Sequence, residues 1–529
     1  MARLPSATCI GFEPLTQHGF EKRTPGAVSQ GCRPRPPEID AFQHGGPAME
    51  KQAATVIPHP AQSRPGDPHP EAPFDTAGST TPGSGVQGDS GQHVEAPGKT
   101  PHDDDFLARL AEQSVHLERL RQEKRRCLGE IEALRAENRW EDILALFHPV
   151  EEKVPELEAV GLAHALRAEI GFALGHLGRY GEAIALYSAC VEAEPSNFHF
   201  HAGLAYTAYD SLYAARARKV MLHPAERKTR IELAHRHFAA ARALRPDGVT
   251  NAYRQGMLFK QIQSKPDKAL PLFETAVKNW RAYTDELRQA RHQERKNYIK
   301  ALYQLASCLL DAGQPREALH HLEDCLREDA ASNHLTELHK RFALGKVHFA
   351  LGDHAAARAA LEAAAAHAEP AEDDYVFELL ARVLLAQNDA EAAMAAVNRV
   401  PGHRRRPYFR WTEADVLAAR GDIERACRVL REAADRDRRG SHKALARLAR
   451  LEFRRRNYEE SLAAARKACD FFQETYGNPF FDGLFWTAAA LLRMGHIQEA
   501  RGTLADLEHL QPQYPNLARL KAMIEAEGR

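Results

Sequence analysis

A small residue returns nine times along this chain, each time on one face of a helical pattern, and it constrains the fold more than any other feature. Its clearest copy lies in residues 178–197, GRYGEAIALYSACVEAEPSN, where Ala183 and Cys190 share a helix face. Gly178 suits the end of the preceding helix, and Pro195 stops this one. Two helices approach to about 8–10 Å only where the contacting side chains are small. The stretch therefore predicts one half of a tightly packed helix pair.

The small residue recurs at intervals close to a fixed length. Six of the eight intervals fall between 33 and 39 residues, and a small or aliphatic partner follows seven residues after each copy. In six copies the preceding turn carries Gly or Asn, which tolerate the left-handed conformation that ends a helix. Repetition at this period predicts an all-α solenoid in which each helix pair packs on the next. The nine positions are Ala183, Ala234, Ala269, Ala318, Ala357, Ala393, Ala426, Ser461 and Ala500.

This arrangement resembles the tetratricopeptide repeat, a 34-residue helix–turn–helix unit, over about residues 138–512. The resemblance implies a right-handed α-solenoid of about nine repeats, which begins with a half repeat at residues 138–150. Residues 513–529 are expected to form a C-terminal capping helix. The weaker copies depart from the pattern, since Ser461 replaces alanine and several lack the closing proline. The best copies are residues 164–197, 299–332, 338–371 and 481–514.

Residues 1–103 form a separate block that is rich in proline and glycine. Half of the chain's 30 prolines lie in the first 100 residues, and no periodic apolar spacing is present. Such a composition cannot bury enough apolar surface to offset the entropy of ordering, so we expect a disordered region. Two interpretations stay open: translation starts at Met49, or the region carries linear motifs.

A heptad pattern follows in residues 104–137. Seven of its nine seam positions are apolar, and Gln113 and Lys124 interrupt it. The helix could form a short coiled coil that makes a homodimer, or it could pack back on the solenoid as a cap. The seam positions are Phe106, Leu110, Gln113, Leu117, Leu120, Lys124, Cys127, Ile131 and Leu134.

Two of the intervals between small residues, 51 and 49 residues, exceed the 34-residue period. The first excess falls near residues 210–229, between the two helices of one repeat. The second falls near residues 282–296, between one repeat and the next. We expect helical extensions at opposite edges of the solenoid. Insertions in solenoids often mark binding faces, although lengthening a loop is also cheap in free energy.

The family resemblance implies that the first helix of each repeat lines a concave groove that binds peptides. The residues placed there are aromatic and basic, so a peptide with apolar anchors and acidic residues would suit them. The alternative for each aromatic residue is burial in the repeat core. The implied groove residues are Phe172, His176, Lys300, Tyr303, Phe342, Lys346, Tyr375, Arg382, Tyr408, Trp411, Asp415, Lys443, Arg450, Arg454, Phe485 and Arg493.

One binding mode of the family is not matched by this sequence. Chaperone-binding members hold a C-terminal carboxylate with lysine and asparagine at fixed groove positions. Phe172, Ser307, Lys346 and Arg382 stand where the asparagine pair would be expected. We therefore expect no carboxylate clamp of that kind.

The net charge of the whole chain does not indicate a nucleic-acid or membrane partner, because 71 basic residues balance 72 acidic ones. Locally, residues 401–470 carry 19 Lys and Arg against 11 Asp and Glu. Such a segment could bind nucleic acid. Interleaved acidic residues favour a solvated face or a site for an acidic partner instead.

No motif in the sequence indicates catalysis, a cofactor or a metal. The sequence lacks a phosphate-binding G-x-x-x-x-G-K-[ST], a G-x-S-x-G and an H-E-x-x-H. Eight scattered cysteines without a C-x-x-C pair favour reduced thiols in the cytoplasm. The first residues do not resemble a secretory signal, and no apolar run is long enough to span a membrane.

The sequence therefore predicts a non-catalytic scaffold or adaptor that binds a protein or peptide in the groove. Two alternatives stay open. The chain could bind nucleic acid through residues 401–470, or it could be a regulatory subunit of a separately encoded enzyme.

Overall fold

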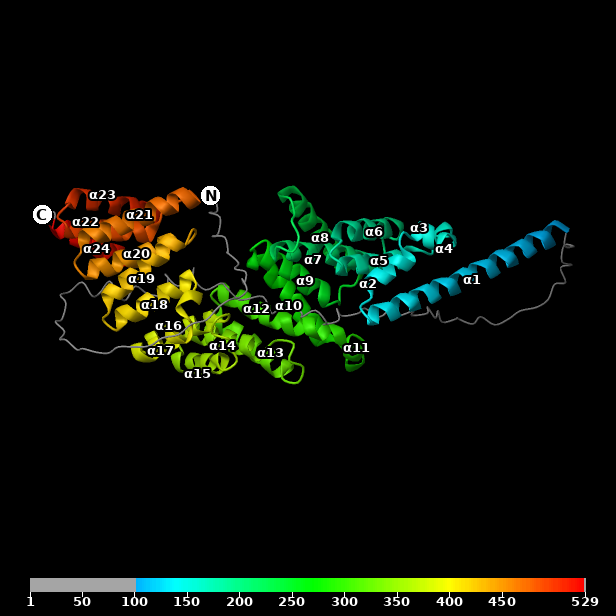
Figure 1. The fold of residues 1–529 in the computed structure, drawn as a ribbon, viewed down its shortest axis with the longest axis horizontal. Helices are drawn as coiled ribbons and strands as arrows, with labels where there is room; N and C mark the ends of the chain where they lie inside the picture. Colours follow the sequence, from blue (N-terminus) through cyan, green and yellow to red (C-terminus); the bar gives the residue numbers. More distant parts are fainter. Residues whose placement is uncertain (1–100, 528–529) are drawn as a thin grey trace, which may run out of the picture. The chain divides into compact units, whose positions relative to one another are not determined.

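The computed structural model describes residues 101–527, with only the backbone described at 101–105 and 107. All secondary structure in this range is helical, and consecutive helices pack as antiparallel pairs (Figure 1). The all-α solenoid expected from the sequence is confirmed. The described helices fall into two compact units, residues 101–301 and residues 302–527. Residues 1–100, for which the sequence predicts disorder, lie outside the described range.

The first unit contains α1 to α11 and the start of α12. Its helices are α1 (Pro101–Ala136), α2 (Trp140–Phe147), α3 (Val150–Lys153), α4 (Pro155–Ala159), α5 (His164–His176), α6 (Tyr180–Ala193), α7 (Phe198–Arg216), α8 (Pro224–Leu244), α9 (Thr250–Met257), the π-helical turn η3 (Leu258–Ile262), α10 (Pro266–Ala282), α11 (Asp285–Ala290), the 3₁₀ turn η4 (His292–Glu294) and α12 (Arg295–Asp311).

The second unit begins within α12 and continues to the last described helix. Its further helices are α13 (Pro315–Asp329), α14 (Glu337–Leu351), α15 (His354–Ala365), α16 (Asp374–Ala386), α17 (Ala390–Arg399), the 3₁₀ turn η5 (Gly402–Arg404), α18 (Pro407–Ala419), α19 (Ile423–Arg436), α20 (Ser441–Arg454), α21 (Tyr458–Tyr476), α22 (Phe481–Arg493), α23 (Ile497–Leu510) and α24 (Leu517–Glu527).

The nine recurring small residues all lie on the second helix of a pair, and all nine have no exposed surface. Their size is what lets the two helices approach. Ser461, the one exception to alanine, keeps the same position because its hydroxyl donates a hydrogen bond to the carbonyl oxygen of Ala449, at 2.8 Å. Serine is thus tolerated where its polar atom finds an acceptor on the neighbouring helix.

Tyr187 of α6 shows how little space the helix contacts leave. Its ring lies between two glycines, Gly171 of α5 and Gly203 of α7. A Cβ added at Gly203 would stand 2.3 Å from the ring, and one added at Gly171 would stand 2.9 Å from it. Both positions therefore need glycine because of packing.

The long helix α1 divides into two parts. Leu120, Cys127 and Ile131 are buried against the helices that follow, so this part caps the repeats. Phe106 and Leu110, nearer the start, are 63% and 52% exposed, and α1 runs clear of its neighbours there (Figure 1). The exposed seam covers about two heptads, which is short for a stable coiled coil on its own.

Two histidines form a buried polar pair between α7 and α8. The Nδ1 atoms of His201 and His237 lie 2.8 Å apart, and Nε2 of His201 lies 2.9 Å from the carbonyl oxygen of Pro195. A carbonyl only accepts, so His201 carries its proton on Nε2 and accepts from His237 at Nδ1. Burial, then the neighbouring His201, lowers the pKa of His237 to about 4.

We predict that Gly203→Ala lowers the free energy of unfolding by about 1–3 kcal/mol, because the new methyl group overlaps the ring of Tyr187. Gly175→Ala on α5 is the matched control, since an added Cβ there meets nothing within 4 Å. The control should raise stability by about 0.5–1 kcal/mol. Chemical denaturation followed by circular dichroism measures both changes. Equal changes in the two variants would contradict the packing role.

Stability should also fall in mild acid because of His237. Its pKa in the folded chain is about 4, below the ordinary value of 6.5, so the unfolded chain binds the proton first. The contribution of His237 is complete above about pH 6.5 and is lost as the pH falls towards 4, by about 1–2 kcal/mol after solvent screening. Denaturation curves across this range, compared with those of His237→Gln, isolate the effect. An equally steep pH dependence in the variant would contradict it.

Candidate functional site

In the second unit, the first helices of successive pairs contact one another. α14 touches α16, α16 touches α18, α18 touches α20 and α20 touches α22, whereas the second helices α15, α17, α19 and α21 make at most sparse contacts with each other in this part of the described chain. Helices on the concave side of a curved stack must lie closer together than those on the convex side. The first helices therefore form the inner face, which we define as the sides of α12 (from residue 302), α14, α16, α18, α20 and α22 that meet one another.

A small hollow opens at the start of the inner face. Tyr303 and Ser307 of α12 and Phe342 and Lys346 of α14 line it together with aliphatic side chains, and its volume is about 10 Å³. That is room for about one water-sized group. The ring of Tyr375 on α16 packs edge-on against Phe342 at 4.7 Å between centroids. The sequence placed four of these five residues in the binding groove, and the structure brings them together.

The contact between α16 and α18 is polar. Asp374 is almost completely buried, and it accepts hydrogen bonds from Nε of Arg406 at 3.0 Å and from the hydroxyl of Tyr408 at 2.5 Å. One turn further along, Thr412 donates to Glu378 at 2.6 Å. Burial raises the pKa of the Glu378 carboxyl, and the nearby Arg382 opposes that rise.

The contact between α18 and α20 is built on Trp411. Lys443 Nζ and Arg447 Cζ lie 5.5 and 5.4 Å from the centre of its ring, within the range of cation–π attraction. Asp415, one turn along α18, pairs with Arg447 at 3.3 Å and with Arg450 at 2.7 Å. Burial first, and Arg447 second, lower the pKa of Lys443.

Buried polar atoms without a hydrogen-bond partner are spread along this same face. Within the described chain, each of the inner helices α12, α16, α18, α20 and α22 carries at least one such atom. A tryptophan Nε1 and an arginine Nε can only donate, while hydroxyls donate and accept. The face is therefore rich in donors that lack acceptors. The atoms are the hydroxyls of Tyr303, Ser307, Tyr375 and Thr487, Nε1 of Trp411, and Nε of Arg450 and Arg493.

Several groove residues expected from the sequence lie elsewhere or are already in contact with neighbours. In the first unit, the ring of His176 stacks on Trp140 at 4.0 Å, and Phe172 packs between Trp140 and Arg135. These two side chains belong to the packing of α2 on α5. Lys300 precedes Tyr303 by one turn on α12, in the first unit.

The remaining expected residues lie on the inner helices of the second unit. Arg382 lies 5.4 Å from the ring centre of Phe349, Phe485 is buried, and Arg493 pairs with Glu527 at 3.5 Å. Arg454 is exposed at the end of α20.

Ser307, Glu378 and Arg447 belong to the inner face but were not among the expected residues. Ser307 occupies a groove position in the repeat alignment, which is the signal that could have identified it. Glu378 and Arg447 become relevant only through their pairing with Thr412 and Asp415 on the next helix.

Several arginines of the basic segment 401–470 pair with carboxylates of the same unit. Arg405 pairs with Glu413 at 2.6 Å, and Arg406 pairs with Asp374. Other arginines of the segment also face carboxylates of this unit, so they present little free positive charge to a phosphate backbone. These are Arg410, Arg420, Arg431, Arg447, Arg450, Arg455 and Arg466.

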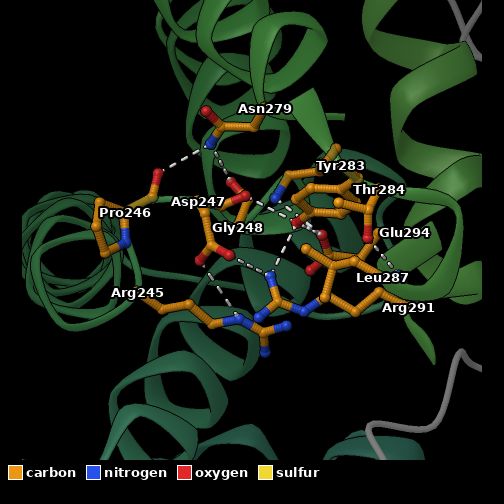
Figure 2. Close-up of polar contacts among 11 residues, drawn as sticks. Arg245, Pro246, Asp247, Gly248, Asn279, Tyr283, Thr284, Leu287, Arg291 and Glu294 are labelled. Atoms are coloured by element: carbon orange, nitrogen blue, oxygen red, sulfur yellow. Dashed lines mark hydrogen bonds and ion pairs between the residues drawn. The ribbon is translucent and has the colours of Figure 1, made fainter. Parts of the chain in front are cut away.

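The insertion near residues 282–296 folds onto the turn between α8 and α9, as Figure 2 shows. The hydroxyl of Tyr283 lies 2.7 Å from the carbonyl oxygen of Asp247 and 2.8 Å from Glu294 Oε2, and it accepts from Arg291 at 3.1 Å. Arg291 also donates to Asp247 Oδ2 at 2.6 Å, and Glu294 accepts from the backbone N–H of Val249 at 3.0 Å.

Asn279 completes this cluster by donating to the carbonyl oxygens of Pro246 and Gly248 at 2.9 and 3.0 Å (Figure 2). The side chains of Tyr283, Arg291 and Glu294 are thus bonded within the first unit. They hold the start of α12 in place, and they offer few free groups to a partner.

In residues 101–527, no group of three or more His, Cys, Asp or Glu side chains is placed to hold a metal ion. None of the helices in that range has the length and apolar character needed to cross a membrane. Of the six cysteines in the described chain, five are buried and Cys469 is half-buried, and none forms a disulfide there.

Comparison with known proteins gives the following matches. Models of the tetratricopeptide repeat match residues 165–197, 300–332, 342–408 and 412–474. No curated protein matched the sequence.

Three solved structures illustrate the structural likeness. The Pseudomonas aeruginosa protein pilF is 14% identical over 45% of this chain and 90% of its own, with a TM-score of 0.33. Yeast Tom70 is 11% identical over 77% of this chain and 96% of its own, with a TM-score of 0.36. A tetratricopeptide repeat protein from Parabacteroides merdae is 13% identical over 51% and 92%, with a TM-score of 0.36.

Two tyrosine-to-phenylalanine substitutions on the inner face should have opposite effects on stability. Tyr303→Phe removes a buried hydroxyl that has no partner, so it should leave stability unchanged or raise it by about 1 kcal/mol. Tyr408→Phe removes a hydrogen bond to the buried Asp374, so it should cost about 1–3 kcal/mol. Chemical denaturation measures both. A loss of stability in Tyr303→Phe as large as that in Tyr408→Phe would show that the Tyr303 hydroxyl is bonded in solution.

Proposed function

This chain is a tetratricopeptide-repeat protein, of a class that generally serves as an interaction scaffold, and we propose that it binds an extended, acidic segment of a partner protein along the inner face of its second unit. The observation that carries the proposal is the series of buried donors without acceptors on successive inner helices. Leaving such a group unpaired costs about 1–3 kcal/mol. A ligand that supplies acceptors to several of these donors on one face would recover that free energy.

An extended peptide supplies acceptors at a regular spacing through its carbonyl groups, and acidic side chains add stronger ones. The hollow at Tyr303 and Ser307 has room for about one water-sized group, such as one carboxylate or carbonyl oxygen. The charge of the face agrees with an acidic ligand. Beyond the Arg406–Asp374 pair, the carboxylates are Glu378 and Asp415, and the cations are Lys346, Arg382, Lys443, Arg447 and Arg450.

Aromatic side chains would supply the apolar part of the contact. Phe342, Tyr375 and Trp411 lie on three successive inner helices, and 6–8% of the surface of each is exposed. Partly exposed aromatic and arginine side chains of this kind carry most of the binding energy at protein interfaces.

The chain would thus act as an adaptor in the cytoplasm without performing chemistry, as is general for these repeats. The cysteines of the described chain are mostly buried and form no disulfide there, which fits a reducing compartment. A regulatory subunit of a separate enzyme is a special case of this proposal, in which the enzyme carries the acidic segment.

Partner capture from a native lysate tests the proposal. The double variant Tyr303→Phe, Ser307→Ala should recover about tenfold less partner, because two hydrogen bonds to the ligand are lost while the free protein stays folded. Tyr180→Phe with Ser188→Ala on α6 makes the same chemical changes on a second helix of the first unit, and it should capture the partner as the wild type does.

Two results would count against the proposal. One is unchanged capture by the folded double variant, which would remove the hollow from the binding site. The other is capture that disappears after nuclease treatment, which would indicate a nucleic-acid partner.

A further inference from the structure

The hairpin between α7 and α8 stands out from the rest of the first unit. α7 has 19 residues and α8 has 21, compared with 13 and 14 in the preceding pair α5 and α6. At about 1.5 Å per helical residue, the longer helices extend the hairpin by roughly 10 Å beyond a normal pair. We call its end, residues 216–230, the hairpin tip. It overlaps the first of the two insertions in the repeat period, near residues 210–229.

The hairpin tip is strongly basic. It carries six cationic side chains and a single carboxylate, Glu226, in 15 residues. Arg230 pairs with that carboxylate, at 2.5 Å. Arg216 and Arg227 donate to the side chain and backbone of Gln261 and to the backbone of Ile262, which are neutral, so their charges are not cancelled. The cations are Arg216, Arg218, Lys219, Arg227, Lys228 and Arg230.

The tip also exposes an apolar side chain at its centre. Met221 is 91% exposed, the largest value among the exposed large hydrophobic side chains of the described chain. It lies between Val220 and Leu222, which are half-buried, in the loop that joins the two helices. The Met221 side chain is thus available to enter an apolar medium, which would be favourable.

The lysines of the next turn, Lys260, Lys265 and Lys268, extend the basic surface, with Asp267 as the nearest acid in that stretch. Lys265 and Lys268 also help to lower the pKa of His235, after burial, which reflects the positive field there. Such a surface attracts a ligand whose negative charge is spread over a wide area.

We propose that the hairpin tip binds a membrane surface that contains anionic lipid headgroups, with Met221 entering the headgroup region. The cations attract the negative surface, and the apolar side chain adds contact with the acyl boundary. This is peripheral binding by a loop, which needs no membrane-spanning helix. It goes beyond the adaptor function, since it would place the adaptor and its partner at a membrane.

The size of the effect can be stated in advance. Each Lys or Arg near an anionic membrane contributes about fivefold to binding. The double variant Lys219→Gln, Lys228→Gln should therefore weaken vesicle binding by about 20- to 30-fold. Met221→Ser should weaken it by about threefold or more, because the apolar contact is lost. Both sites are exposed, so the fold should be unaffected.

The test is co-sedimentation of the full chain with vesicles of phosphatidylcholine alone and with phosphatidylserine added. The wild type should bind only the anionic vesicles, and high salt should release it. The matched control, Arg466→Gln with Lys467→Gln, removes two cations from α21 in the second unit and should bind as the wild type does.

Three results would overturn the proposal. The first is no binding to anionic vesicles, and the second is equal binding of the wild type and the Lys219, Lys228 variant. The third is binding to polyglutamate, with loss in the same variant, while vesicles are not bound. That result would assign the tip to an acidic protein.

Discussion

The structure depends on nine positions at which two helices pack closely because the side chain at the contact is small. Each is an alanine or a serine with no exposed surface, and each lies on the second helix of its pair. Close approach lets every pair bury both of its faces on its neighbours, which an isolated pair could not do. Where a large ring must fit, as at Tyr187, the helices on either side carry glycine. The tolerance for added volume is therefore small along the whole array.

The same packing gives the inner face its chemistry. The first helices of the second unit meet one another, so their polar side chains are removed from water. Some find partners across the contact, as Asp374 and Asp415 do, and these pairs hold successive repeats in register. Others, such as the hydroxyls of Tyr303 and Ser307, find none. A buried donor without an acceptor lowers stability, and this cost is the basis of the proposed ligand contact.

The two insertions show that similar additions to a repeat can serve different ends. The one near residues 282–296 uses Tyr283, Arg291 and Glu294 on its own unit, and its hydrogen-bonding groups are largely consumed there. The hairpin tip carries six cations against one carboxylate and leaves Met221 in water. A partner can use charge and apolar surface that are exposed to water. The hairpin tip is therefore the insertion that we propose as a contact surface.

The sequence by itself determined the helix pairs, because a small residue at a fixed period is a local signal that close packing requires. The resemblance to the tetratricopeptide repeat implied that Tyr303, Phe342, Lys346 and Tyr375 share the groove side of their helices. Only the tertiary structure decided which of the expected residues have partners. Phe172 and His176 pack against Trp140, and Arg405 and Arg406 turn inward to carboxylates about eight and 32 residues away in sequence. Whether a charge or a donor is free depends on what the neighbouring helix brings to it, and no local pattern contains that information.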